Sequence, residues 1–177
     1  MLKLFALAAA AVSAAVPAAV LPTPALLSHA AWWETVTVTI AADGQANSCE
    51  YRTSLLAGTK SCDVVGPAST DVGKGTKDQY TRLTFERRFR PDRGAVGEDS
   101  LPSGDTLLGR QVLALAIDAK GLVAGCKIVA KAGEMTPDYG CEEAVAEKFE
   151  TGFSGSTGNA REGYMSILVY GHEEHVV

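Results

Sequence analysis

Four cysteines are the residues whose type and spacing most directly predict a chemical bond. They are Cys49, Cys62, Cys126 and Cys141. Four cysteines allow three pairings, and the spacing favours the local pairs, Cys49–Cys62 and Cys126–Cys141. Each bond would close a loop of about 15 residues and stabilise the fold by about 3 kcal/mol in the chain-entropy model. A redox or metal centre needs a close pair such as Cys-x-x-Cys, which the sequence lacks, so we expect structural disulfides.

No other group of residues predicts a catalytic or metal site. Of the three histidines, His29 lies near the N-terminus, and His172 and His175 lie near the C-terminus. The run 172–175 lacks the His-Glu-x-x-His spacing of a helical zinc site, so we expect a solvated tail. The serines of segment 152–156 have no histidine or acid placed beside them to activate a nucleophile. We therefore expect no catalytic residue, no metal and no cofactor, and the sequence does not predict an enzyme.

Five arginines form the one basic cluster of the sequence. They are Arg82, Arg87, Arg88, Arg90 and Arg93. Such a cluster could bind an acidic partner, or the acidic helix face expected between Glu142 and Glu150 of the same chain. We expect the simpler outcome, a solvated end of a strand. Trp32 and Trp33 are expected to pack onto the domain, whereas an exposed tryptophan would mark a contact site.

The N-terminal residues have the pattern of a secretory signal peptide. Lys3 supplies a positive charge, residues 4–16 are almost all Ala, Leu and Val, and prolines follow. Residues 28–30 form a small-x-small cleavage site that would make Ala31 the mature N-terminus, and residues 16–18 form a second candidate. The prolines come before about 20 apolar helical residues accumulate, which argues against an uncleaved membrane anchor. We expect a periplasmic or secreted protein, because disulfides persist there.

The charge balance excludes some classes of partner. The chain has 16 Lys and Arg against 21 Asp and Glu, a net charge of −5 at pH 7. This acidic balance argues against nucleic acid or anionic lipid as the main partner. Removal of the leader would leave about 147 residues, enough for one domain or two very small ones. We expect membrane contact only through a partner or an uncleaved leader.

Two segments repeat one pattern. In residues 35–44 and in residues 112–121, matching apolar residues occupy alternate positions along a predicted strand. Each segment ends at a glycine, and a cysteine follows five residues later. The aligned apolar residues are Val36, Val38 and Ile40 in the first segment and Leu113, Leu115 and Ile117 in the second. Alternate residues share one face of a strand. Gly44 and Gly121 supply the positive φ that a tight reversal needs, so each segment predicts a β-hairpin.

A helix is expected after the second hairpin. Thr136 is a suitable N-cap, Pro137 suits the first turn, and Gly152 follows the end. The expected buried stripe is Cys141, Val145 and Phe149. A final strand at 164–170 then completes a ββαβ unit.

The sequence therefore predicts an α+β fold of two ββαβ-type repeats, with an antiparallel sheet and a packed helix. The first repeat is degenerate, because Gly66-Pro67 stops any helix before a third strand at 80–85. The expected boundaries are 1–30 for the signal peptide, 31–90 for the first repeat, 91–109 for a loop, 110–171 for the second repeat and 172–177 for a tail.

The second half resembles the C-terminal domain of TonB, and in particular the cysteine-bearing TonB-like periplasmic domains. The residues that carry the resemblance are 117–121, 126–129 and the Cys141 helix ending at Phe149 and Phe153. The resemblance covers residues 109–170 and implies TonB C-terminal-like repeats. The chain departs from the family in lacking a long Pro-rich spacer and in carrying Lys131-Ala132-Gly133 where Ser-Ser-Gly is usual. The fold therefore carries over better than the energy-transducing role.

The resemblance implies function through strand pairing. A TonB-like domain pairs a short receptor segment with the edge of its sheet, and the resemblance places the final strand at that edge. The expected partner-binding residues are Tyr164, Ser166, Ile167, Leu168, Val169 and Tyr170. We expect a periplasmic interaction module, linked to energy-coupled outer-membrane transport, that binds an envelope protein or peptide segment such as an outer-membrane receptor.

Two alternatives to a partner protein stay open. The final strand could pair with a second copy of the chain or with the first repeat of the same chain. The protein could also be an exported enzyme or small-ligand-binding protein that reuses the fold. A concave pocket with convergent titratable groups would favour this second class.

Overall fold

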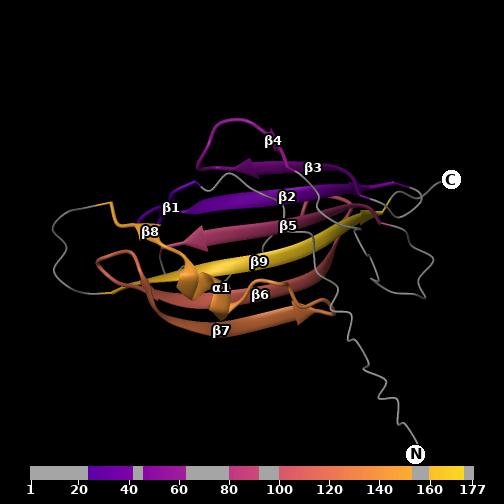
Figure 1. Cartoon of the computed structure of the whole chain (residues 1–177). Helices are drawn as coiled ribbons and strands as arrows, with labels where there is room; N and C mark the ends of the chain where they lie inside the picture. The colour runs from indigo at the N-terminus through magenta and orange to yellow at the C-terminus, as the bar shows by residue number, and fades with distance from the viewer. Residues whose placement is uncertain (1–23, 42–45, 63–79, 92–99, 153–159, 174–177) are drawn as a thin grey trace, which may run out of the picture.

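Strands dominate the protein in the computed structural model (Figure 1), which describes residues 24–41, 46–62, 80–91, 100–152 and 160–173. The elements in chain order are β1 (Leu26–Leu27), β2 (Trp32–Ile40), β3 (Ala46–Thr53), β4 (Lys60–Ser61), β5 (Tyr80–Arg90), β6 (Asp105–Ile117), β7 (Val123–Gly133), α1 (Cys141–Ala146), β8 (Phe149–Glu150) and β9 (Arg161–Glu173).

Seven strands form one antiparallel sheet in the order β4-β3-β2-β5-β9-β6-β7, and β1 pairs with β8 in a small parallel sheet. In each half of the chain, a hairpin is followed by a third strand that pairs with the first strand of that hairpin. In the first half, β5 follows the β2-β3 hairpin and pairs with β2, and in the second half, β9 follows the β6-β7 hairpin and pairs with β6. Because β5 and β9 pair with each other, the halves meet at the centre of the sheet. The internal repeat itself stays a prediction from the sequence pattern.

The predicted α+β fold with a packed helix in a ββαβ repeat is wrong, because the helix has only six residues. Thr136 and Pro137 lie in the preceding loop, and Gly140 is the N-cap, with its N–H donating to Glu143 Oε2 at 2.7 Å. The helix ends at Glu147, whose ψ of 155° is extended. Phe149 then enters β8, where its side chain is buried and its N–H donates to the Gly121 carbonyl at 2.8 Å.

One face of the sheet carries the apolar core. The residues that the seven-stranded sheet contributes to it are Trp32, Phe89, Leu113, Leu115, Ile117, Val123, Met165 and Ile167. Leu26, Ala144 and Phe149 cover them from β1, α1 and β8. The Phe89 ring lies 5.7 Å from that of Trp32 and 5.3 Å from that of Phe149, between centroids. Aromatic contacts of this kind stabilise by about 1 kcal/mol beyond their burial.

The second predicted reversal is confirmed at Gly121. Its φ is +81°, and a side chain there would collide with the Phe149 carbonyl oxygen. Both observations explain the glycine, because L residues rarely adopt this φ. Gly44, its predicted counterpart, lies outside the described residues.

Several predicted boundaries shift because the strands are longer than the sequence pattern suggested. β5 extends from Tyr80 to Arg90, and β6 begins at Asp105, within the predicted loop 91–109. β9 continues to Glu173, into the predicted tail 172–177. The strands at the centre of the sheet therefore have 11 to 13 residues.

Residues 24–31, expected to border the cleavage site, pack onto the domain. Leu26 is 8% exposed and pairs with Phe149. The Ser28 N–H donates to the Glu150 carbonyl at 3.1 Å, and Trp32 Nε1 donates to the Leu27 carbonyl at 3.0 Å. If the predicted leader is removed, this packing favours the earlier of the two predicted cleavage sites, at residues 16–18, because cleavage at the later one would remove β1.

We predict that the mature chain keeps β1. Mass spectrometry of the exported protein should find an N-terminus before Pro24, and a chain that starts at Ala31 would contradict this.

Leu26→Ala should lower the free energy of unfolding by about 2 kcal/mol, because it opens a cavity in the core. Leu56→Ala is the matched control, since Leu56 is 37% exposed, and should change stability by less than about 0.5 kcal/mol. Equal effects of the two substitutions would show that β1 does not support the core.

Candidate functional site

The structure confirms the predicted cysteine pairs. Cys49 bonds Cys62 with a Cα–Cα distance of 5.1 Å, and Cys126 bonds Cys141 with a Cα–Cα distance of 5.6 Å. The first bond joins β3 to the end of the β4 segment, and the second joins β7 to the first residue of α1. Both disulfides therefore lie near the outer strands of the sheet. They are compatible with a protein of an oxidising compartment.

The predicted pairing strand is not at an edge. The residues Tyr164, Ser166, Ile167, Leu168, Val169 and Tyr170 all lie in β9. β9 pairs with β5 on one side and with β6 on the other, so its backbone groups are already used. The prediction of a free edge here is wrong because the first half of the chain supplies the neighbouring strand, with Phe85 opposite Val169. Of the alternatives, pairing within the same chain is the one found.

β7 is instead the outer strand of this half. Within the described residues it pairs only with β6, which leaves its other side free. Ile128 and Val129 on β7 are 40% and 44% exposed, and Val145 on α1 is 50% exposed. The Cys126–Cys141 bond holds α1 beside the strand. We name Ile128, Val129 and Val145, together with the free side of β7, the β7 edge.

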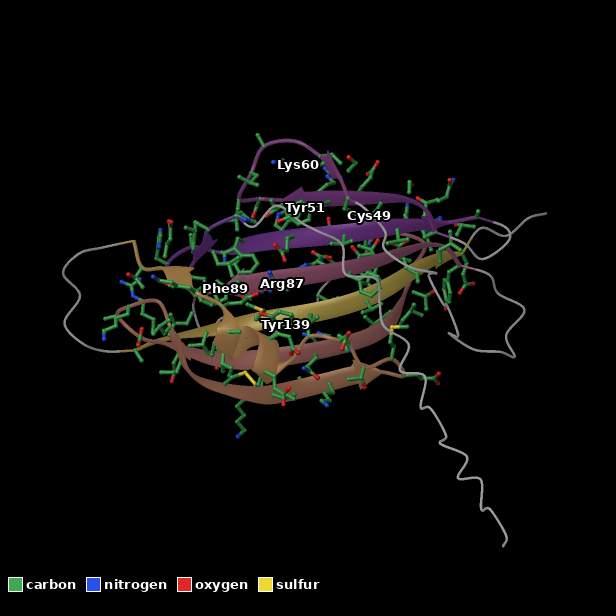
Figure 2. All side chains as sticks on the ribbon, in the orientation of Figure 1. Cys49, Tyr51, Lys60, Arg87, Phe89 and Tyr139 are labelled. Carbon is green, nitrogen blue, oxygen red and sulfur yellow. A yellow bond between two sulfur atoms is a disulfide. The ribbon has the colours of Figure 1, made fainter. Side chains whose placement is uncertain are left out.

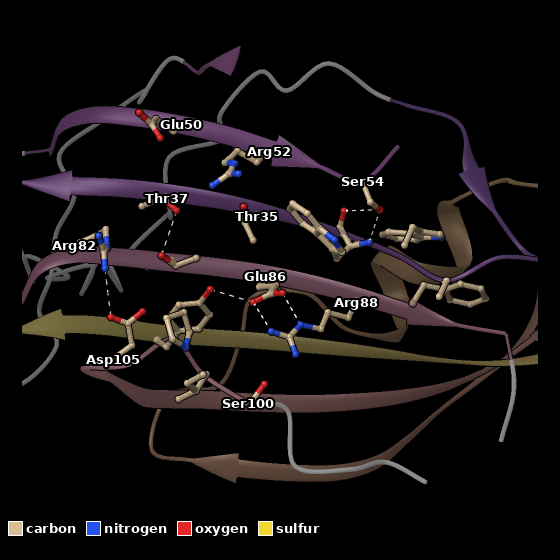
Figure 3. Close-up of a pocket in the computed structure, with 18 of the residues that line it drawn as sticks. Thr35, Thr37, Glu50, Arg52, Ser54, Arg82, Glu86, Arg88, Ser100 and Asp105 are labelled. Carbon is tan, nitrogen blue, oxygen red and sulfur yellow. Dashed lines mark hydrogen bonds and ion pairs between the residues drawn. The ribbon is translucent and has the colours of Figure 1, made fainter. Parts of the chain in front are cut away.

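The sheet face opposite the core is polar and hollowed (Figure 3). An open groove of about 1100 Å³ runs across β3, β2, β5 and β9, and Ala31, Ser54, residues 100–102 and Asp105 complete its lining. Its polar side chains include Thr35, Thr37, Arg52, Arg82, Glu86 and Arg88. We name it the polar groove. The threonines of β2 line it because alternate residues of a strand point to the same face, here the face opposite the core.

Buried carboxylates in the polar groove are already paired. Glu86, 6% exposed, accepts hydrogen bonds from Arg88 and, at 3.0 Å, from the Tyr170 hydroxyl. Burial, and then the Glu86 charge, raise the pKa of Tyr170 well above its usual range, so this phenol stays a donor. Asp105 pairs with Arg82 at 3.4 Å and with His172 Nδ1 at 2.7 Å. His172, predicted to lie in a tail, therefore belongs to this network.

A second charged cluster lies on the core face. Arg87 forms ion pairs with Glu34 and Glu147, and its guanidinium carbon lies 4.8 Å from the centre of the Tyr139 ring. The Tyr51 hydroxyl donates to Glu34 Oε2 at 3.1 Å. Figure 2 shows Arg87 between Tyr51 and Tyr139. The five side chains come from β2, β3, β5 and the residues flanking α1, so this cluster joins elements far apart in the sequence.

The predicted arginine cluster divides between the two faces. Arg82, Arg88 and Arg90 line the polar groove, whereas Arg87 points to the core face. Arg93 lies outside the described residues. The sequence alone could have predicted this division, because successive residues of a strand point to opposite faces. Arg82, Arg88 and Arg90 have even numbers, whereas Arg87 has an odd number.

Two further expectations concern metals and membranes. Among the described residues, no three His, Cys, Asp or Glu side chains are grouped to hold a metal ion. His175 and residues 153–156 lie outside the described part. No helix in the described ranges is long and apolar enough to cross a membrane.

Comparison with known proteins does not assign a family. No protein-family model, no curated protein and no solved structure matches the chain. The resemblance to TonB-like domains therefore remains an expectation from the sequence. Any assignment of function must depend on the β7 edge and the polar groove.

We predict that Arg87 is required for stability. Arg87→Met removes the charge that compensates Glu34 and Glu147, and should lower the free energy of unfolding by about 3 kcal/mol. Arg52→Met makes the same chemical change at an exposed position of β3, and should cost less than about 0.5 kcal/mol. Urea unfolding of both variants is the measurement. An Arg87→Met protein as stable as the parent would mean that the cluster contributes nothing.

We also predict loss of stability at alkaline pH. Burial, and then the Glu34 charge, raise the pKa of Tyr51 from 10.0 to about 12. The unfolded chain releases this proton first, so stability should fall as the pH rises from 10 through 12. The melting temperature at several pH values is the measurement. Tyr51→Phe, which cannot ionise here, should show a shallower decline, and an unchanged slope would contradict the assignment.

Proposed function

We propose that the protein is a periplasmic or secreted interaction module that binds an extended segment of an envelope protein along the β7 edge. The observation that carries the proposal is an 11-residue outer strand with exposed apolar side chains beside its free side. Partner strands add to such edges through backbone hydrogen bonds, and side-chain pockets give specificity. Catalysis has no part in the proposal.

The local irregularities of β7 limit where pairing occurs. Its register with β6 shifts between Val112 and Leu113 and between Ala116 and Ile117, which leaves Ala124 and Val129 without opposite residues. Bulges and lysines discourage indiscriminate edge pairing. Residues 125–128 form the regular run between the two shifts. A short segment therefore fits this edge better than a long strand.

The side chains around this run indicate the chemistry of the partner. Ile128 and Val145 offer apolar surface, while Lys127 and Lys131 are exposed on the same strand. The register with β6 puts Lys131 on the same face as Ile128 and Lys127 on the opposite face. An extended segment that alternates apolar and acidic residues would therefore bury the first pair and neutralise Lys127. A TonB-like role, with an outer-membrane receptor as partner, is the form of this proposal that the sequence resemblance suggests.

Crosslinking in cells tests the proposal. We expect a photoreactive amino acid in place of Ile128 to capture a partner, whereas the same replacement of Leu56 on the β3–β4 connection should capture none. Val145→Glu should abolish the crosslink at position 128, because it places a charge in the apolar contact. Equal capture at both positions, or none at 128, would contradict the proposal.

Hydrogen exchange then separates strand pairing from simple surface contact. The amides on the free side of β7 should become protected when the captured segment, made as a peptide, is added to the purified protein. Val145→Glu should keep the parent melting temperature, because an exposed substitution changes stability by less than about 0.5 kcal/mol. Binding without new protection in β7 would exclude strand addition.

A further inference from the structure

The polar groove lies on the opposite side of the sheet from the core and is separate from the β7 edge. Its floor consists of side chains only, because the backbone groups of β2, β5 and β9 are paired on both sides within the sheet. A ligand here must therefore be recognised by side chains. Hydroxyls dominate the centre, where Thr37 and Thr84 lie within hydrogen-bond distance, 3.2 Å between their Oγ1 atoms.

The charges of the groove favour an anion. Arg52, Arg82, Arg88 and Arg90 line it, against Glu50, Glu86 and Asp105. Glu86 and Asp105 lie beneath arginines, with side chains only 7% and 2% exposed, whereas the Arg82 side chain is 44% exposed. Arg52, Arg82 and Arg90 therefore face the solvent against Glu50, the one exposed carboxylate of the lining, while Glu86 and Asp105 lie below their arginines. In a chain with a net charge of −5, this is a local concentration of positive potential.

Trp33 supplies a flat apolar surface within this polar setting. It lines the groove and is 38% exposed, while its neighbour Trp32 is 3% exposed in the core. Trp33 lies opposite Arg88 across the β2–β5 pair. Its backbone is held by Ser54, whose hydroxyl accepts from the Trp33 N–H at 3.0 Å, and by Thr53. Trp33 thus has a fixed backbone position in the register opposite Arg88, and an aromatic with one polar edge favours ligand contact there.

We propose that the polar groove binds an acidic oligosaccharide, a chain of sugar rings that carry carboxylates. The apolar face of a sugar ring stacks on Trp33, its hydroxyls exchange hydrogen bonds with the threonines, and its carboxylates bind arginine. Threonine hydroxyls both donate and accept, which matches sugar hydroxyls. Arginine binds carboxylates with two parallel hydrogen bonds. An acidic peptide fits less well, because the groove offers no free backbone edge for the peptide groups.

Calorimetric titration of the purified full chain tests this inference. The probes are a hexamer of galacturonic acid, maltohexaose as the uncharged sugar, and hexaglutamate as the acidic peptide. The acidic sugar should bind with saturation, the other two should bind at least about tenfold more weakly, and added salt should weaken the binding. Hexaglutamate that binds as tightly as the acidic sugar, or no binding by any probe, would overturn the proposal.

Variants locate the binding. Trp33→Ala and Arg52→Gln should each weaken binding of the acidic sugar by about tenfold. Lys131→Gln makes the same charge change on β7, outside the groove, and should leave binding unchanged. If Lys131→Gln weakens binding as much as Arg52→Gln, the attraction is a general charge effect and the proposal is wrong. Val145→Glu should also bind normally, which keeps this test independent of the β7 edge.

Discussion

The Arg87 guanidinium pairs with Glu34 and Glu147 and connects parts of the fold that are distant in the sequence. One carboxylate belongs to β2 in the first half of the chain, and the other follows α1 in the second half. Removing a charge from water is costly unless it is paired, so the three groups require one another. The position of α1 over the sheet, and of β8 after it, depends on this charge balance.

Pairing of β5 with β9 also connects the two halves of the chain, in this case within the sheet. It joins the two halves along ten pairs of opposed residues, from Tyr80 opposite Glu173 to Arg90 opposite Tyr164. A strand that would be an edge in either half alone becomes internal. The free sides therefore move outward to β7 and to the short β4. The continuous sheet also provides a second broad face, and the polar groove crosses the junction between the halves.

Sequence reasoning succeeded where local chemistry decides the outcome. The cysteine spacing, the turn at Gly121 and the alternation of Leu113, Leu115 and Ile117 all lead to the observed structure. The predictions failed for features that depend on residues distant in the sequence. The helical signals around Phe149 are outweighed by the core and by β1, and the edge predicted for β9 is removed by β5. The polar groove was missed because its residues come from five strands and a loop, and their convergence requires the sheet order.

The positions of the two disulfides have a consequence for the order of events in maturation. One bond stabilises the β3–β4 margin of the sheet, and the other holds α1 against β7 at the opposite margin. Thiols stay reduced in the cytoplasm and oxidise outside it. For an exported chain, the centre of the sheet can form from hydrophobic pairing alone, whereas its two margins become covalently fixed only after export. In such a chain, the β7 edge that we propose to bind a partner would be completed only in the oxidising compartment.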